Sequence, residues 1–371
     1  MSRWRRSRNW SRKSWRNWQE APRFGGAYFI MDIIANNGYL NVPGIIGAGY
    51  TFNIILSGRG VGKTFGFLKQ LREDAVAGRG RFAYLRRLQT QIDICGKAEF
   101  NPFKRLDQVY HLETPVKAIS KYSSGFYDAD RQLLGVGVAL STFGSLRGFD
   151  GSDITSILFE ECIPKQGEHR LKEEASMLWD AYETINRNRE LEGQPATRLY
   201  CIGNSNNTAA DLLVDMGLVS RVERMKEKGI PIYQDRKRSL QLIVLGSSSV
   251  GERKRQTALY RFLGDESGYT AAALDNDPAE EWGARNRSRP LQEYKPLATV
   301  GEITIYEHKS RREYYISSHR SGNPPTYGTG PMDLDRFRVR FRAELWQAVM
   351  DNKVVYERTN AEILLIKYLG A

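Results

Sequence analysis

Residues 57–64 hold the side chains and glycines whose chemistry is easiest to assign. They read Ser-Gly-Arg-Gly-Val-Gly-Lys-Thr and lie between an apolar run at 50–56 and a helical pattern from Phe65 to Ala77. Glycines between a strand and a helix let backbone N–H groups turn toward phosphate oxygens, and the helix N-terminus adds partial positive charge. Lys63 is predicted to reach the β- and γ-phosphates of ATP, and the Thr64 hydroxyl to bind Mg²⁺.

This stretch matches a phosphate-binding loop with one departure, because Ser57 stands where the motif has glycine. A glycine-rich turn that contains Gly-Lys-Thr by chance is the alternative, and the flanking strand and helix patterns argue against it. We therefore predict a nucleotide site that uses the whole loop. Its residues are Ser57, Gly58, Arg59, Gly60, Val61, Gly62, Lys63 and Thr64.

Two acids follow a second apolar run, Ile157-Leu158-Phe159, at the predicted end of a strand. Open α/β sheets bind ligands at the carboxyl ends of their strands. Glu160 is predicted to hold the metal, a position that is usually Asp, and Glu161 to orient or deprotonate the attacking water. Asn204 ends a neighbouring strand, where its amide is placed to sense the γ-phosphate. The alternatives are exposed acids at a strand end and a simple turn residue.

Arginines are the third candidate group. Arg147 lies in a flexible stretch at 144–148, and Arg187 follows a predicted helix that ends at Asn186. Ring ATPases use an arginine from a neighbouring subunit to neutralise charge in the transition state. Arginines also suit the C-terminal end of a helix through its dipole. Spacing alone does not choose between these two interpretations.

The elements that position these residues alternate between strand and helix, which predicts an α/β fold with a mainly parallel sheet and helices on both faces. A second, smaller α/β domain is expected toward the C-terminus, after a charged, helix-prone linker. In the first part we expect a helix at 28–40, a loop at 41–49, a strand at 81–85, a hairpin at 127–140, a strand at 154–159, a helix at 171–186 and a strand at 198–202. In the last part we expect strands at 300–306, 313–317 and 354–356, a helix at 334–350 and a terminal helix.

Composition excludes several classes of protein. The 371 residues have a net charge of +12 and a hydrophobic content of 41%, which fits a globular protein with a polyanionic partner. Three scattered cysteines and four histidines show no spacing typical of a disulfide framework or a zinc site. No apolar run has the length of a membrane span, and the basic N-terminus lacks the apolar segment of a secretory signal.

The N-terminal arm concentrates much of this positive charge. Within residues 1–18, tryptophans at 4, 10, 15 and 18 are interleaved with arginines and one lysine, and no acid occurs before Glu20. Cationic side chains neutralise phosphates and indole rings stack on unpaired bases, so the arm is predicted to contact RNA or DNA. A solubilising or membrane-surface tail is the alternative, and the tryptophan spacing fits neither one helix face nor a strand alternation.

Taken together, these stretches resemble the DNA-packaging ATPases of small tailed phages of the phi29 type. The resemblance covers roughly residues 48–215 and continues more weakly to the C-terminus. It is carried by residues 57–64, Tyr84-Leu85-Arg86-Arg87, 157–161, Asn186-Arg187-Asn188-Arg189-Glu190 and Ile202-Gly203-Asn204.

The resemblance implies a P-loop ATPase domain of the additional-strand, catalytic-glutamate type. It also implies a linker and a small C-terminal RNase H-like domain that has lost nuclease activity. In that domain we interpret Lys309, Arg311 and Arg312 as a patch that faces nucleic acid, with a solvated loop as the alternative. The expected division is a basic arm at 1–24, the ATPase domain at 25–248, the linker at 249–285 and the C-terminal domain at 286–371. We recognise no carboxylate cluster in the last two that suits a metal-dependent nuclease.

The resemblance further implies a homopentameric ring at the portal of a viral prohead, in the host cytoplasm, tethered by a phage structural RNA. With ATP and Mg²⁺, this terminase-like motor would pump double-stranded DNA. In that scheme Lys63 is the phosphate lysine, Glu161 the catalytic glutamate, Arg187 the trans-acting arginine finger and Arg147 a second basic trans-acting residue.

Our prediction is therefore a ring-forming ATPase that drives double-stranded DNA into a prohead and contacts phosphates through flexible basic residues. Loop residues Lys165, His169 and Arg170 are the candidate DNA contacts. One alternative is another ring ATPase or helicase of the same fold. A second is a non-hydrolysing nucleic-acid-binding scaffold, which the departures at Ser57 and Glu160 keep open.

Overall fold

The computed structural model describes most of the chain beyond the basic arm. The described residues are 33–145, 150–164, 171, 173–204, 210–246, 248–265, 267–275 and 288–370. The predicted arm lies outside these ranges, as do the candidate residues Arg147, Lys165, His169 and Arg170. Among the described residues, no helix is both long and apolar enough to span a bilayer.

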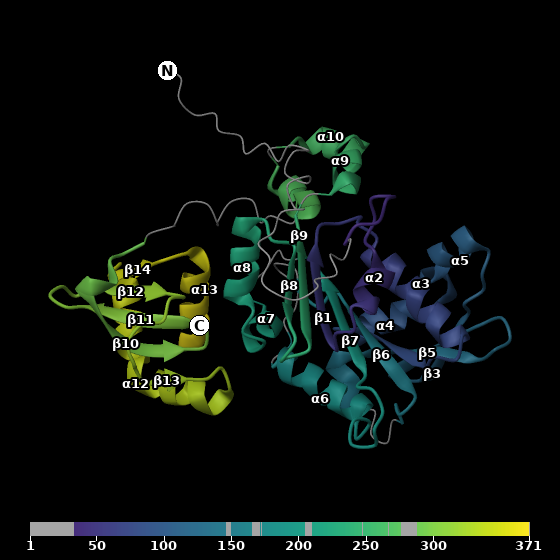
Figure 1. The fold of residues 1–371 in the computed structure, drawn as a ribbon, viewed down its shortest axis with the longest axis horizontal. Helices are drawn as coiled ribbons and strands as arrows, with labels where there is room; N and C mark the ends of the chain where they lie inside the picture. Colours follow the sequence, from purple (N-terminus) through teal and green to yellow (C-terminus); the bar gives the residue numbers. More distant parts are fainter. Residues whose placement is uncertain are drawn as a thin grey trace. The chain divides into compact units, whose positions relative to one another are not determined.

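A nine-stranded sheet forms the centre of the larger domain (Figure 1). Its order is β3-β4-β5-β2-β6-β7-β1-β9-β8, and the six strands from β5 to β9 in this order are mutually parallel. The strands are β1 (Phe52–Ser57), β2 (Arg81–Arg86), β3 (Val116–Ser120), β4 (Ser123–Tyr127), β5 (Leu133–Ala139), β6 (Ile154–Glu160), β7 (Arg198–Gly203), β8 (Ile232–Asp235) and β9 (Leu240–Leu245). The predicted mainly parallel sheet is confirmed.

The strand order places helices on opposite faces of this sheet. Along the sheet, the chain crosses from β1 to β2 in one direction and from β6 to β7 in the other. Because crossovers between parallel strands are right-handed, the connecting helices α3 and α6 cover opposite faces. One strand, β7, lies between the phosphate-loop strand β1 and the acid-bearing strand β6, as the resemblance implies. The helices are α2 (Val42–Gly47), α3 (Lys63–Val76), α4 (Gln89–Cys95), α5 (Lys104–Tyr110), α6 (Glu174–Asn186), α7 (Asp211–Asp215) and α8 (Val219–Lys228).

Two predictions before β1 are wrong. The described part of the expected helix at 28–40 is a turn closed by a bridge between Ile34 and Leu40. The expected loop at 41–49 contains α2 instead. There the Asn41 side chain accepts a hydrogen bond from the Gly44 N–H at 3.2 Å, and Pro43 suits the first helical turn because it lacks a donor.

The C-terminal domain is a mixed sheet with two helices (Figure 1). Its order is β13-β10-β11-β12-β14, in which β10, β11 and β12 form an antiparallel meander and the two outer strands are parallel to their neighbours. The elements are β10 (Tyr294–Val300), β11 (Ile303–His308), β12 (Tyr314–Ser317), β13 (Thr326–Tyr327), α12 (Pro331–Met350), β14 (Val354–Tyr356) and α13 (Thr359–Leu369).

The single strand expected at 300–306 is wrong, because a tight turn divides it. Val300 pairs with Ile303 across Gly301 and Glu302, and Gly301 has a φ of +51°, which suits glycine. The Glu302 side chain leaves this turn to accept hydrogen bonds from the backbone N–H groups of Val219 at 2.8 Å and Ser220 at 2.7 Å. These N–H groups open α8, so the carboxylate caps a helix of the ATPase domain.

A charged cluster also joins α8 to the segment before α13. Arg358 lies 2.8 Å from the exposed carboxylate of Glu227 and 3.7 Å from the buried carboxylate of Glu223. The pKa of Glu223 is raised to about 7, mainly by burial; Glu227 and Glu357 also raise it, while Arg358 and Asn360 lower it. The net effect is that the folded protein favours the protonated form of Glu223.

We therefore expect Glu223→Gln to change how stability depends on pH. Folding raises the pKa of the Glu223 carboxyl from 4.5 to about 7. Its protonated form therefore contributes stability that is fully present below pH 4.5 and is lost as pH rises through 7. At pH 8 the variant should be more stable than wild type by about 3 kcal/mol, and at pH 4.5 the two should nearly match. Urea unfolding at both pH values measures this.

Glu227→Gln is the control for this prediction. Its carboxylate is half-exposed and makes the closer contact with Arg358, so the variant should not gain stability at pH 8. An equal gain in both variants would show that general surface charge, rather than the buried Glu223 carboxylate, sets the pH dependence.

Candidate functional site

The phosphate loop lies where the sequence predicted, between β1 and α3. Gly60 and Gly62 have φ values of +92° and +82°, a conformation that side chains other than glycine disfavour. Helix α3 begins at Lys63, so its first N–H groups face the loop. A cavity of about 540 Å³ opens there, lined by residues 59–65, by Glu160 and Glu161, and by Asn204.

Lys63 donates hydrogen bonds to the start of its own loop. Its Nζ lies 2.9 Å from the Ser57 carbonyl, 3.0 Å from the Gly58 carbonyl and 3.2 Å from Oδ1 of Asn204. Burial lowers the pKa of the Lys63 ammonium to about 8, while Glu160 raises it. The loop thus holds a buried cation beside the cavity, and Asn204 lies next to it at the cavity wall.

The departure at Ser57 has a structural counterpart. The Ser57 side chain is fully buried, and its Oγ accepts a hydrogen bond from Lys63 Nζ at 2.7 Å. The next residue must be glycine, because a Cβ on Gly58 would lie 2.4 Å from the carbonyl oxygen of Leu274. The requirement for glycine thus falls on position 58. At position 57 a buried serine fits, and its hydroxyl adds one acceptor for Lys63.

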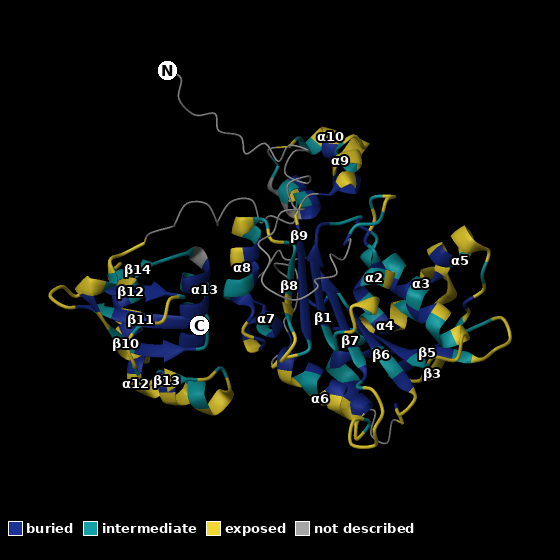
Figure 2. Cartoon of the chain, viewed as in Figure 1, coloured by how far each residue is buried: buried dark blue, intermediate teal, exposed yellow. Residues whose placement is uncertain are grey.

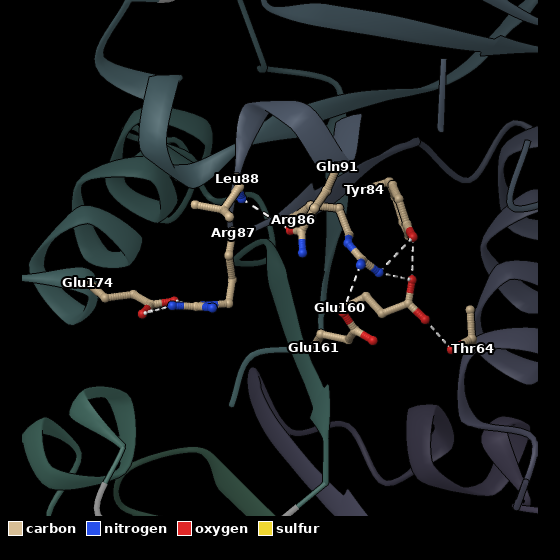
Figure 3. Close-up of polar contacts among 9 residues, drawn as sticks. All are labelled: Thr64, Tyr84, Arg86, Arg87, Leu88, Gln91, Glu160, Glu161 and Glu174. Carbon is tan, nitrogen blue, oxygen red and sulfur yellow. Dashed lines mark hydrogen bonds and ion pairs between the residues drawn. The ribbon is translucent and has the colours of Figure 1, made fainter. Parts of the chain in front are cut away.

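Glu160 is held by three side chains, one from α3 and two from β2 (Figure 3). It accepts hydrogen bonds from the hydroxyl of Thr64, at the start of α3, and from the hydroxyl of Tyr84, in β2. The Arg86 guanidinium adds an ion pair at 2.9 Å. Burial raises the pKa of Tyr84 well above its ordinary value, and Glu160 adds to that shift, so Tyr84 stays a neutral donor.

Arg86 joins the two predicted acids (Figure 3). Its second terminal nitrogen lies 2.8 Å from Glu161, whose side chain is about two-fifths exposed. Glu161 has a φ of +54°, a conformation that costs energy for a residue with a Cβ and that clusters at functional sites. Backbone geometry and one guanidinium therefore set the position of the Glu161 carboxylate.

Sequence reasoning assigned no role to Arg86 or Tyr84, although both lie in a stretch that carried the resemblance. The parallel pairing of β2 with β6 brings these residues to the site. It aligns Leu85 with Phe159 and places the residues that follow them at the carboxyl ends of the strands. Arg86 and Glu160 are 74 residues apart in the chain, so no local pattern shows their contact, which appears only in the folded chain.

The neighbouring arginine points to a different environment. Arg87 is fully buried, and it forms a two-point ion pair with Glu174 of α6, with N···O distances of 2.5 and 2.9 Å (Figure 3). Bidentate guanidinium–carboxylate geometry makes such a pair directional. It therefore ties the end of β2 to the first turn of α6.

The predicted linker contacts the phosphate loop directly. It contains α9 (Ser249–Arg255), α10 (Ala258–Leu263), α11 (Gly268–Thr270) and a π-helical turn (Ala271–Asp275). The Arg59 N–H donates to the carbonyl of Ala273 at 2.6 Å, and the Arg59 guanidinium reaches the Tyr269 hydroxyl at 3.1 Å. This segment therefore helps to set the shape of the loop, which the sequence did not suggest.

Acids of the linker are used internally. Asp265 and Asp275 both pair with Arg255, at 2.7 and 2.5 Å. In the parts of the chain that the structure describes, no group of three or more His, Cys, Asp or Glu side chains is arranged to hold a metal ion.

Arg187 and the nucleotide cavity of its own chain lie at opposite ends of the parallel strands. Its neighbour Arg189 donates to the carbonyl of Ser152 at 2.5 Å, just before β6 begins, whereas Glu160 lies where β6 ends. A strand of seven residues spans about 20 Å. The Arg187 side chain is half-exposed and lies 3.9 Å from Asp150. It is therefore out of reach of the phosphates bound by its own chain.

This fold and site define a P-loop ATPase with one strand between the phosphate-loop strand and the acid strand. The family model of the podovirus DNA encapsidation protein (Gp16) matches residues 35–281, which is more than half of the chain. The chain belongs to that family, and it is a phage DNA-packaging ATPase.

Comparison with solved structures agrees on the fold. A chain of the bacteriophage Phi-29 viral genome packaging motor assembly is 16% identical, with a TM-score of 0.59 over 90% of this chain and 99% of that chain. The Phi-28 gp11 DNA packaging motor is 17% identical, with a TM-score of 0.55 over 90% and 98%. A search of curated protein sequences found no match.

Proposed function

We propose that this chain assembles into a ring whose ATP hydrolysis drives double-stranded DNA into a viral prohead. The observation that carries the proposal is the set of contacts that links Thr64, Glu160, Arg86 and Glu161 at the mouth of the nucleotide cavity. A scaffold that never hydrolyses ATP has no use for an exposed carboxylate held at this place. Membership of the DNA encapsidation family supports DNA as the transported polymer.

The residues around the cavity suit ATP with Mg²⁺. The Thr64 hydroxyl and the Glu160 carboxylate contact each other and are hard oxygen donors, the type that Mg²⁺ takes together with phosphates and water. When bound, the ion would neutralise charge on the β- and γ-phosphates. Lys63 would exchange its contacts with Ser57 and Gly58 for phosphate oxygens.

Glu161 is the proposed general base. Its carboxylate borders the cavity and retains solvent access, as a group that accepts a proton from an attacking water must. Arg86 is a positioning residue, since it holds Glu161 and Glu160 at a fixed separation. Asn204 contacts Lys63 and is placed to report on the γ-phosphate.

The proposed ring follows from the position of Arg187. An arginine that is remote from its own cavity and half-exposed can complete the site of a neighbouring copy. Arg147 is proposed as a second trans-acting residue, and Lys165, His169 and Arg170 as DNA contacts. All four lie outside the described residues, so these roles rest on the sequence.

The finer assignments follow the resemblance. We propose five copies at the portal of a prohead in the host cytoplasm, a phage structural RNA as tether, and the domain division at residues 24, 248 and 285. The solved chain with the higher TM-score comes from a viral genome packaging motor assembly, which supports a portal-bound machine. The C-terminal domain is proposed to bind nucleic acid without cutting it.

Mixing inactive subunits tests the proposal. Lys63→Ala removes the phosphate lysine and leaves Arg187 intact, whereas Arg187→Ala removes the finger and leaves the cavity intact. Each variant alone should show almost no DNA-stimulated ATP turnover, and an equimolar mixture should recover part of it. The measurement is phosphate release with and without double-stranded DNA at rising protein concentration.

Three outcomes would contradict parts of this proposal. If the mixture stays inactive while wild type hydrolyses ATP, Arg187 does not act across a subunit boundary. If wild type never exceeds Lys63→Ala under any condition, the cavity does not support hydrolysis and the scaffold alternative holds. Strand separation of a DNA duplex by wild type would instead favour the helicase alternative.

A further inference from the structure

Helix α12 of the C-terminal domain has two apolar faces, and only one of them is covered. Phe337, Phe341 and Leu345 are buried against the domain, as expected for an amphipathic helix. On the opposite side Val339 is 90% exposed, and Met332 and Met350 are also mostly exposed. Figure 2 shows exposed stretches along α12. The gain from burying such side chains grows with their apolar area, and exposed apolar patches mark interaction sites.

The exposed apolar residues lie in a stripe along one helix face, which Arg336 interrupts between Met332 and Val339. Positions 332, 339, 343, 346 and 350 are Met, Val, Ala, Trp and Met, and with Arg336 they follow one another at alternating steps of four and three residues. This spacing places them along one helix face, with the period of a helix–helix seam. The stripe runs the whole length of the 20-residue helix.

Arginines flank this stripe, and the Arg340 guanidinium lies over the Phe341 ring at 5.2 Å from its centroid. Arg340 and Arg342 are exposed, and neither forms an ion pair within the residues that the structure describes. The acids of the helix are already engaged: Glu344 accepts from the Tyr314 hydroxyl, and Asp335 pairs with Arg338. Arginine, methionine and tryptophan are the residues that protein interfaces enrich, so the composition matches an interface.

We propose that this stripe is a docking surface for a protein partner that presents an apolar ridge flanked by carboxylates. Nucleic acid fits less well, because phosphates would engage Arg340 and Arg342 but leave Val339 and the methionines exposed. A second copy of α12 also fits less well. An antiparallel copy aligned along the stripe places Arg340 beside Arg342 of the second copy, and a parallel copy places Arg336 beside its own counterpart. Both arrangements bring like charges together.

The partner is sought on the prohead, and in that respect the inference rests on the proposed function. The experiment measures binding of the full-length labelled chain to DNA-free proheads by co-sedimentation. ATP turnover of the chain alone with DNA is measured separately, so that failure of the motor and failure of the docking surface can be told apart.

Val339→Glu is the main variant, because position 339 is so exposed that the change should leave folding intact. It should bind proheads at least about tenfold more weakly than wild type, since it places a charge in the middle of the stripe. Arg340→Ala/Arg342→Ala should also weaken binding, with a steeper loss at low salt. Phe262→Asp, an equally exposed apolar residue in α10, is the matched control and should bind normally.

Ribonuclease treatment of the proheads separates the two classes of partner. A protein partner requires that Val339→Glu remain weaker than wild type on treated proheads. The inference is overturned if Val339→Glu binds as tightly as wild type. It is also overturned if only the arginine variant is impaired and ribonuclease removes that difference, which would identify the partner as RNA.

Discussion

Replacing Glu161 by Gln is expected to lower DNA-stimulated ATP turnover by about 10²- to 10⁴-fold, the range of general-base catalysis. The amide keeps the size of the side chain and an acceptor oxygen, so the cavity should still bind ATP. Only the proton acceptor is lost. The expected signature is therefore a large fall in turnover with a nearly unchanged dissociation constant for ATP.

Fluorescent-nucleotide binding and phosphate release measure the two effects separately. Lys63→Ala should lose both binding and turnover, because the buried ammonium is part of the phosphate site. Glu192→Gln, an exposed carboxyl beyond α6, should change neither. Turnover of Glu161→Gln within tenfold of wild type would sink the assignment of Glu161 as the base.

The largest effect on stability is expected at the buried Arg87–Glu174 pair. Arg87→Met leaves the Glu174 carboxylate buried and without its bidentate partner, and breaking such a pair costs about 3–5 kcal/mol. Arg87→Met/Glu174→Leu removes both charges and should recover much of that loss. Two apolar side chains can fill the space without the desolvation cost of an unpaired ion.

Urea unfolding of the two single variants and the double variant completes the cycle. Arg79→Met is the control, because the Arg79–Asp74 pair is largely exposed on the arginine side and should be worth less than about 1 kcal/mol. If Arg87→Met costs no more than Arg79→Met, the ion pair does not hold the end of β2 against α6. In that case packing alone positions the residues that lead to Arg86.

Local patterns predicted much of the ATPase domain. The phosphate loop, β2, β6, α6 and β7 lie within a few residues of where apolar runs and glycines placed them. The misses have local causes as well. Asn41 and Pro43 open a helix in a stretch that glycines made look irregular, and the turn at Gly301 divides a run that reads as one strand. Strands β8 and β9 were not predicted at all.

The sequence by itself determined the nucleotide chemistry of this protein. In the phosphate loop, glycine, lysine and threonine at fixed spacing act through a backbone conformation that residues close in the chain set. Glu160 and Glu161 lie at the end of β6, a strand that the apolar residues just before them define. Chemistry that depends on residues close in the chain can be read from the chain.

Only the tertiary structure decided how these parts are joined. The ion pairs of Arg86 with both acids, the contact of Arg59 with Ala273, and the separation of Arg187 from its own cavity all depend on which strands and segments become neighbours. Strand order is set by the packing of the whole sheet and its helices, and no local pattern encodes it. The covered and uncovered faces of α12 were likewise settled by the sheet against which the helix packs.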